Sequence, residues 1–265
     1  MPRGTVDRGG MTEPAEATRP GAPRSAAIPA VVLAPGADDP AAFAPCWADL
    51  LGRPVVAWAV DVLEAAPEIG TLALAVPPQR AAAARRLART AGWTKVWTVA
   101  APAGSDPAEQ TRAALDHLPP SDRVLLHDGA RPLLAPATLA ALLAVVPANT
   151  KHPALTLALA AVPARETMKW VDAAGDVRGT PPRATLWQPQ YPAVCPRAVL
   201  DDALRGPHAS AIAARAATAG LAWLLDACAE CTIRLVRAPD DDLPVRAPED
   251  LAVVGAILRP RHTGR

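Results

Sequence analysis

Short apolar runs alternate with segments of helical period along most of this 265-residue chain. The runs predict strands at residues 29–33, 71–76, 95–99, 123–127, 154–160 and 233–236. Apolar residues at helical spacing predict helices at 54–65, 79–91, 107–118 and 135–145. Strands that alternate with helices in this way connect by right-handed crossovers and pair into a mostly parallel sheet with helices on both faces. The sequence therefore predicts an α/β fold of three layers.

The chain is long enough for one sizeable core, which we expect at residues 26–258. Residues 1–25 are rich in glycine, proline, threonine and charge and have no periodicity, so we expect a disordered tail there. Residues 259–265 are expected to be loose as well. Inside the domain, residues 162–192 replace the regular alternation by short strand-like pieces around a Gly- and Pro-rich centre.

Charge and composition exclude several classes of partner. The formal net charge is +1, which gives no electrostatic reason to expect nucleic acid or a membrane surface. No apolar run approaches the roughly 18 residues that a membrane-spanning helix needs, and the N-terminus lacks an apolar signal core. Cys228 and Cys231 have the spacing of a metal or redox pair, but no second pair or nearby histidine completes a metal set. We therefore expect a cytoplasmic protein with reduced, buried thiols.

The motif HDGARP at residues 127–132 directly follows the apolar run VLL at 124–126. Open α/β sheets bind their ligands at the carboxyl ends of the strands. Asp128 and Arg131 would therefore stand at the edge of the sheet where a ligand is expected. The alternative is an ordinary junction between a strand and a turn, ended by an Arg-Pro pair.

Two further motifs favour the ligand site: VPARETMK at residues 162–169 and RATLW at 183–187. Together the three motifs resemble the 2-C-methyl-D-erythritol 4-phosphate cytidylyltransferase family, whose patterns are HDAARP, VPxxDTxK and DRxxLW. The resemblance extends from about residue 27 to about residue 258. It implies a three-layer α/β/α, Rossmann-like nucleotidyltransferase fold of the GT-A-like type. It also implies a projecting β-arm at about residues 162–192 that embraces a second subunit in a homodimer.

The resemblance assigns roles to four side chains. Asp128 matches the acid that faces the nucleotide phosphates and binds their Mg²⁺. Arg131 matches an arginine placed to meet methylerythritol phosphate, and Thr167 matches a threonine that hydrogen-bonds the same phosphate. Arg183 matches the arginine that positions this phosphate for attack on CTP, a task that suits a guanidinium fork. The alternatives are a salt bridge from loop to helix for Arg131, and pairing within the arm or a solvated charge for Thr167 and Arg183.

In the family, the loop that binds the nucleotide is rich in glycine and carries an arginine and a lysine. The matching loop here, residues 34–40 (the nucleotide loop), departs from this pattern. Ala34, Pro35 and Gly36 match its start, but no lysine or arginine occurs between Arg24 and Arg53. Two carboxylates, Asp38 and Asp39, follow instead. Because cations neutralise the charge that builds on the α-phosphate, we expect cytidylyl transfer to be about a thousandfold or more slower than in an intact relative, on the order of 4 kcal/mol.

A second cation of the family, a lysine shortly before the motif PEDL, has no counterpart at residues 242–244. Arg246 follows two residues later and could compensate for the lysine, but an adjacent position on a strand is expected to point to the other face or further along. Two functions therefore stay open. One is an enzyme that makes CDP-methylerythritol and pyrophosphate from CTP and methylerythritol phosphate, with Mg²⁺. The other is a non-catalytic relative that serves as a binding or partner subunit. No residue specifically supports a further alternative, an enzyme with a shifted nucleotide or sugar-phosphate substrate.

Overall fold

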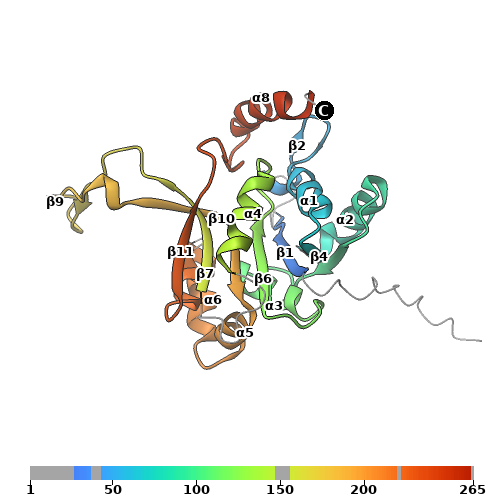
Figure 1. Ribbon diagram of the computed structural model, residues 1–265, viewed down its shortest axis with the longest axis horizontal. Coiled ribbons are helices and arrows are strands. Elements are labelled where there is room, and N and C mark those ends of the chain that lie inside the picture. The colour runs from blue at the N-terminus through green and yellow to red at the C-terminus, as the bar shows by residue number, and fades with distance from the viewer. Residues whose placement is uncertain (1–26, 37–42, 147–155, 220–221, 264–265) are drawn as a thin grey trace, which may run out of the picture.

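The computed structural model describes residues 27–36, 43–146, 156–219 and 222–263, which form a seven-stranded sheet covered by helices and extended by an arm (Figure 1). The order of the strands is β11-β7-β10-β6-β1-β4-β5. Only β10 runs antiparallel to its neighbours, so the predicted, mostly parallel α/β sheet is confirmed. The strands are β1 (Ile28–Leu33), β4 (Ile69–Val76), β5 (Val96–Ala100), β6 (Arg123–Asp128), β7 (Thr156–Pro163), β10 (Trp187–Pro196) and β11 (Thr232–Arg237).

The position of each strand follows from its composition. β1 is apolar throughout and buried at every residue, as a central parallel strand with helices on both faces must be. β6 alternates between the two faces: Leu125 belongs to the core on one side, and Val124 and Leu126 belong to the core on the other. β11, in contrast, is largely exposed and lies at the edge of the sheet.

The helices form two layers. The first core contains residues of α1 (Val55–Ala65), α2 (Pro78–Ala91) and α4 (Pro136–Val145). The second contains residues of α3 (Pro107–Leu115), α5 (Arg197–Arg205), α6 (Ala209–Ala219) and α7 (Ala222–Ala227). The structure bears out the predicted helices α1 to α4, whereas α5, α6 and α7 were not predicted. All four cysteines are free thiols; three are buried, and Cys231 is half-buried.

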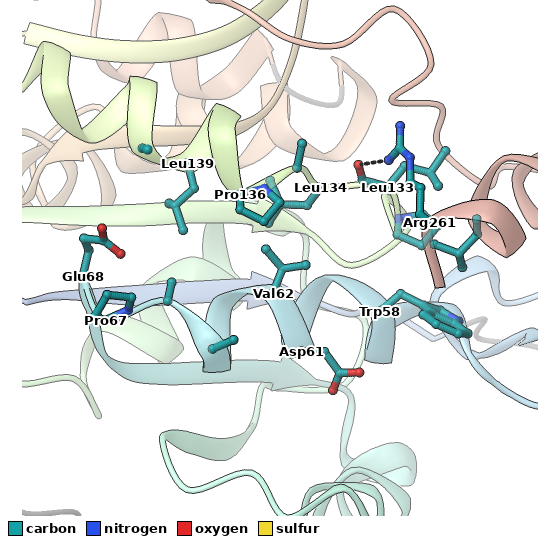
Figure 2. Close-up of a pocket in the computed structure, with 16 residues that line it drawn as sticks. Trp58, Asp61, Val62, Pro67, Glu68, Leu133, Leu134, Pro136, Leu139 and Arg261 are labelled. Carbon is teal, nitrogen blue, oxygen red and sulfur yellow. Dashed lines mark hydrogen bonds between the residues drawn. The ribbon is translucent and has the colours of Figure 1, made fainter. Parts of the chain in front are cut away.

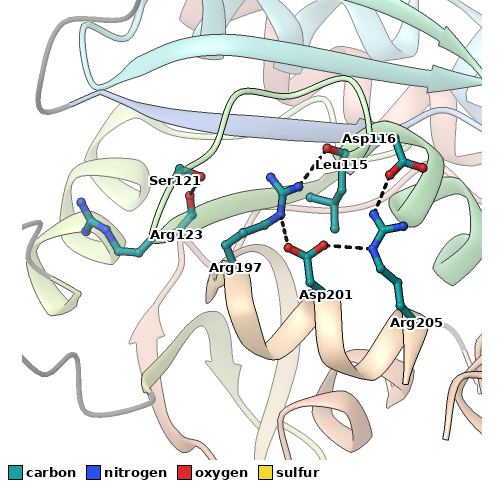
Figure 3. Close-up of polar contacts among 7 residues, drawn as sticks. All are labelled: Leu115, Asp116, Ser121, Arg123, Arg197, Asp201 and Arg205. Atoms are coloured by element: carbon teal, nitrogen blue, oxygen red, sulfur yellow. Dashed lines mark hydrogen bonds and ion pairs between the residues drawn. The ribbon is translucent and has the colours of Figure 1, made fainter. Parts of the chain in front are cut away.

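One ion pair and one hydrogen bond fasten α5 to the end of α3 at the second core (Figure 3). Arg197 donates from Nε to Asp201, at 2.8 Å, and from Nη2 to the Leu115 carbonyl, at 2.9 Å. Arg205 bridges Asp201 to Asp116, with 2.7 Å between its Nη2 and the Asp116 carboxylate. The network ties α5, which follows β10 directly, to an element about eighty positions earlier.

The C-terminal helix α8 (Asp250–Thr263) corrects an expectation, because residues 259–263 are not a loose tail. Arg261 donates to the Leu133 carbonyl at 3.0 Å and pairs with Asp241 at 2.7 Å. The helix packs Val254 and Leu258 into a third core with Trp58 and Leu50. Leu50 belongs to the short strand β2 (Asp49–Leu50), which pairs with β3 (Arg53–Pro54). None of the helices in the described ranges has the length and apolar character needed to cross a bilayer.

The arm leaves the sheet between β7 and β10 and extends well beyond it (Figure 1). It contains β8 (Trp170–Val171), β9 (Val177–Gly179) and the short helix η2 (Arg183–Thr185). The arm is shorter than the expected range of 162–192, because Trp187 already pairs with Pro163 across the two sheet strands. Its large apolar side chains are exposed: Met168, Trp170, Val171 and Val177.

Candidate active site

The candidate site lies where β1 and β6 end side by side. The two strands are parallel neighbours with Leu33 opposite Asp128, so the loops that follow them meet. Gly129 donates its N–H to the Leu33 carbonyl at 2.8 Å. A Cβ atom at Gly129 would stand 2.7 Å from that same oxygen, so the close approach requires glycine. The Gly of HDGARP therefore fixes Asp128 beside the start of the nucleotide loop.

Asp128 is a half-buried carboxylate held by its own turn. Its Oδ1 accepts the N–H of Ala130 at 2.9 Å. Burial raises the pKa of Asp128, while this hydrogen bond and the charges of Arg131 and Arg246 work in the opposite direction. A carboxylate with one free oxygen and little solvation is a suitable ligand for a divalent cation. Magnesium commonly takes one or two protein carboxylates and completes its shell with water and substrate phosphates, so Asp128 fits such an ion. Across the described ranges, no group of three or more potential metal ligands gathers anywhere.

Arg131 is turned into the protein, with 4% of its surface exposed. Its Nη1 donates to the Asp242 carbonyl at 3.0 Å, and the neighbouring Ala130 carbonyl accepts the N–H of Val245 at 2.8 Å. The chain between β11 and α8, residues 238–249, therefore lies over the turn after Asp128 and is called the covering segment below. Burial lowers the pKa of Arg131, whereas the carboxylates of Asp242 and Asp128 raise it. Instead of a salt bridge to a helix, Arg131 makes a hydrogen bond to this covering segment.

Two further titratable groups are buried at the same turn. Burial lowers the pKa of His127 to about 4, and its Nε2 lies 3.0 Å from the Arg131 carbonyl. Burial raises the pKa of Asp242 to about 6, although Arg131 and Arg261 oppose the shift. His127 is therefore neutral near pH 7 and orders the backbone of the motif.

The charge of Arg246 acts on the turn after β6, although its position was expected to face the other way or further along. Its charge lowers the pKa of both Asp128 and Arg131, as only a nearby cation can. The Arg246 side chain is exposed, while its backbone N–H is anchored to the Asp250 carboxylate at 2.7 Å. A cation thus stands where residues 242–244 offer none.

The predicted arm residues lie apart from Arg131. Thr167 is exposed, and Arg183 donates to the Arg165 carbonyl at 3.1 Å. Arg165 in turn pairs with Asp240 at 2.7 Å, which ties the base of the arm to the covering segment. Within one chain, no hydrogen bond or ion pair among the described residues joins Arg131 to Thr167 or Arg183. Their shared role at one phosphate remains a prediction.

The nucleotide loop begins in an ordered form. Ala34 donates to the Ala75 carbonyl at 2.9 Å, and its own carbonyl accepts the indole N–H of Trp47 at 3.2 Å. Trp47 belongs to the short helix η1 (Pro45–Trp47). Burial raises the pKa of the adjacent Cys46 thiol, and the charge of Asp128 adds to the shift. Asp38 and Asp39 lie outside the described residues.

A cation that the sequence motifs did not indicate stands beside this loop. The guanidinium carbon of Arg80 lies 5.5 Å from the centre of the Trp47 ring. Arg80 belongs to α2, far along the chain from Gly36, so no local motif could reveal it. Only the strand order could have indicated that Arg80 lies there. Because β4 pairs with β1, the turn after β4 borders the turn after β1.

A cavity of about 700 Å³ lies elsewhere, between α1 and residues 132–140 (Figure 2). Its walls are mainly apolar, with Trp58, Val62, Leu134 and Leu139 among them, and Arg261 reaches the Leu133 carbonyl at one end. None of the predicted site residues lines it. Phosphates are held by cations and N–H donors, and among the lining residues Arg261 is the one cation and is already paired with Asp241, so we do not take this cavity as the candidate site.

Comparison with known proteins gives one consistent family. The sequence model of the 2-C-methyl-D-erythritol 4-phosphate cytidylyltransferases matches residues 30–260. A cytidylyltransferase of this name from Synechococcus sp. (strain WH7803) is 32% identical over 214 residues, which are 79% of this chain and 88% of that protein. Another, from Ectopseudomonas mendocina, is 37% identical over 157 residues, and the match spans 57% of this chain and 63% of that relative.

Solved structures show the same fold. The 4-diphosphocytidyl-2C-methyl-D-erythritol synthase of Anaerococcus prevotii superposes with a TM-score of 0.71 at 18% identity, over 89% of this chain and 100% of that one. A CMP:2-keto-3-deoxy-manno-octonic acid synthetase complexed with CTP reaches a TM-score of 0.61 at 14% identity, over 89% and 99% of the two chains. At these identities the likeness concerns the fold alone.

Proposed function

This chain belongs to the 2-C-methyl-D-erythritol 4-phosphate cytidylyltransferase family, and we propose that it transfers CMP from CTP to methylerythritol phosphate. In this reaction a phosphate oxygen of methylerythritol phosphate attacks the α-phosphorus of CTP in line. A new O–P bond forms, the bond from the α-phosphorus to the bridging oxygen breaks, and pyrophosphate leaves. The protein's task is to position the two phosphates and to neutralise their charge.

The observation that carries the proposal is the junction of β1 and β6. It brings the backbone of Asp128 and Gly129 next to Leu33, where the nucleotide loop begins, at the carboxyl edge of the sheet. Asp128 would hold Mg²⁺, which supplies positive charge to the phosphates when bound. Arg246, whose charge acts on Asp128, would add a second cation. The backbone of Ala34, Pro35 and Gly36 would border the nucleotide.

The acceptor phosphate is assigned to residues of two subunits. We place Arg131 at the floor of the site and assign Thr167 and Arg183 of the partner subunit to the phosphate of methylerythritol phosphate. Support comes from the arm, which carries both residues on its surface together with exposed apolar side chains that suit burial in a dimer. In this arrangement Arg183 would orient the attacking phosphate.

The non-catalytic alternative has lost much of its basis. It rested on the lack of cations in residues 34–40 and 242–244, and on the expected thousandfold loss of rate. Arg246 now supplies a charge near the second gap, and Arg80 lies beside the first. Cations contributed by other elements can neutralise the same phosphates, so we favour an active enzyme.

Replacing Asp128 by Asn tests the proposal. We expect pyrophosphate release from CTP, methylerythritol phosphate and Mg²⁺ to fall by about a hundredfold or more, because an amide neither carries the charge nor binds Mg²⁺ strongly. The exposed Glu230→Gln is the matched control and should keep the wild-type rate. A wild-type protein that releases no pyrophosphate, or an Asp128→Asn variant that is fully active, would contradict the proposal.

A further inference from the structure

The start of the nucleotide loop borders α2. Strands β1 and β4 are parallel neighbours with Leu33 opposite Ala75, and Ala34 continues the pairing by donating to the Ala75 carbonyl. The turns after the two strands therefore touch. A Cβ atom at Gly36 would stand 3.0 Å from Cγ of Pro77 and 3.7 Å from Cγ of Arg80. The first turn of α2 thus forms one wall beside the loop that lacks a cation of its own.

Trp47 holds the Arg80 guanidinium at this wall. The indole N–H of Trp47 is bonded to the Ala34 carbonyl, and Arg80 lies over the ring of the same indole at 5.5 Å. One side chain therefore fixes both the backbone of the loop and the arginine. A guanidinium stacked on an aromatic face keeps its full charge and its N–H donors.

The charge of Arg80 is available to a ligand. Its side chain is half-buried, and none of the ion pairs or hydrogen bonds among the described residues involves its guanidinium. Of the three other half-buried arginines in the described ranges, Arg53 pairs with Asp61 and Arg197 pairs with Asp201, whereas Arg112 makes no ion pair there. Arg80 is thus a half-buried cation that has no acidic partner among the described residues and is held by the Trp47 ring beside a loop expected to bind a triphosphate.

We propose that Arg80 binds the triphosphate of CTP and replaces, from α2, the cations that the nucleotide loop does not carry. The inference rests on the proposed function, since it names a further binding residue of that same site. Arg80 contributes to the affinity for the nucleotide's phosphate chain and not to binding of methylerythritol phosphate, which is assigned to Arg131, Thr167 and Arg183.

Calorimetry with CTP and Mg²⁺ on wild type, Arg80→Ala and Arg80→Lys tests the inference. Loss of a charge-assisted hydrogen bond should raise the Kd of Arg80→Ala by about 10- to 100-fold, and Arg80→Lys should recover part of this. Arg85→Ala, an exposed arginine on another side of α2, is the control and should bind as wild type does. Inorganic tripolyphosphate, which lacks the nucleoside, should compete with CTP on wild type and much less on Arg80→Ala.

Steady-state kinetics separate binding from a structural role. We expect the KM for CTP to rise in Arg80→Ala while the KM for methylerythritol phosphate stays unchanged. An equal rise in both would mean that Arg80 only supports Trp47 and the loop, and would overturn the inference. Unchanged CTP affinity in Arg80→Ala would overturn it as well, with the proposed function intact. A wild type that neither binds CTP nor releases pyrophosphate would remove the proposed function and the inference together.

Discussion

Burial controls the charge of the side chains around Asp128. His127 is fully buried and loses its affinity for a proton, whereas the equally buried Asp242 gains affinity for one. Arg131 lies between them and donates to a backbone carbonyl instead of pairing with a carboxylate. These environments arise where the segment before α8 crosses the turn after β6, a crossing between residues more than a hundred positions apart.

The pH dependence of stability should reveal His127. Its pKa falls from 6.5 to about 4 on folding, so between these values the unfolded chain binds a proton that the folded protein does not. Stability is therefore lost as the pH falls through this window. From pH 7.5 to 5.0 we expect His127 to account for about 2 kcal/mol of lost unfolding free energy. His127→Gln keeps a donor for the Arg131 carbonyl and should lack this loss.

Urea denaturation of wild type and variant at both pH values measures the difference. Asp242 contributes with the opposite sign, because its raised pKa favours the folded state below about pH 6. This contribution is common to both proteins and cancels in the comparison. The exposed His117→Gln should follow wild type. Parallel pH profiles for wild type and His127→Gln would show that His127 is not held neutral.

The sequence was sufficient for those site features that depend on neighbouring strands. It predicted that Asp128 ends a central strand at the ligand edge, because an apolar run and its motif are contiguous. It misjudged Arg246 because the covering segment is not a regular strand and does not alternate its faces. It missed Arg80 because a cation on α2 reaches the loop only through the pairing of β1 with β4.

Among the elements, β10 and α5 were hardest to predict. β10 contains Pro189, Pro192 and Pro196, which argue against a strand in the interior of a sheet because proline lacks an N–H. The ladder to β7 is interrupted between Pro189 and Ala193, and Pro192 lies within this irregularity. α5 begins directly after Pro196 and is short, so its stability depends on tertiary contacts such as the Arg197 network.

Removing Arg197 should therefore destabilise the protein. Its side chain is 14% exposed and joins the Leu115 carbonyl to Asp201 (Figure 3). We expect Arg197→Ala to lower the unfolding free energy by about 1–3 kcal/mol, since a buried carbonyl loses its charged donor. Arg178→Ala, which removes an exposed ion pair with Asp172 on the arm, is the control and should leave stability near wild type. Equal effects in chemical denaturation would contradict the role given to the network.

At the scale of the whole molecule, the arm is the feature that a single chain does not explain. It carries a row of exposed apolar residues on a hairpin far from the main cores (Figure 1). Monomeric proteins seldom leave such patches in water. A two-fold dimer would cover them and would bring each arm to the site of the other subunit.

Trp170→Asp should separate the dimer. Trp170 is 66% exposed on β8, and a carboxylate there would oppose burial at an interface. In sedimentation we expect wild type at twice the chain mass of 27.4 kDa and the variant shifted towards the monomer, with a raised KM for methylerythritol phosphate. Val253→Asp, which is 53% exposed on α8, is the matched control and should stay dimeric. A monomeric wild type would contradict this assembly.

The order of the strands also bears on how the chain is made. β7 has β10 and β11 as its neighbours in the sheet, and both follow it in the sequence. β1, β4, β5 and β6 can pair with one another as soon as residue 128 has left the ribosome, but β7 then has no strand to join. At ordinary rates of synthesis, roughly 5–20 residues per second, it must wait seconds for β10 to emerge. We therefore expect the nascent protein to hold a four-stranded sheet in which β6 is an unpaired edge. The antiparallel strand β10, which follows the arm, pairs with this edge and joins β7 to the sheet.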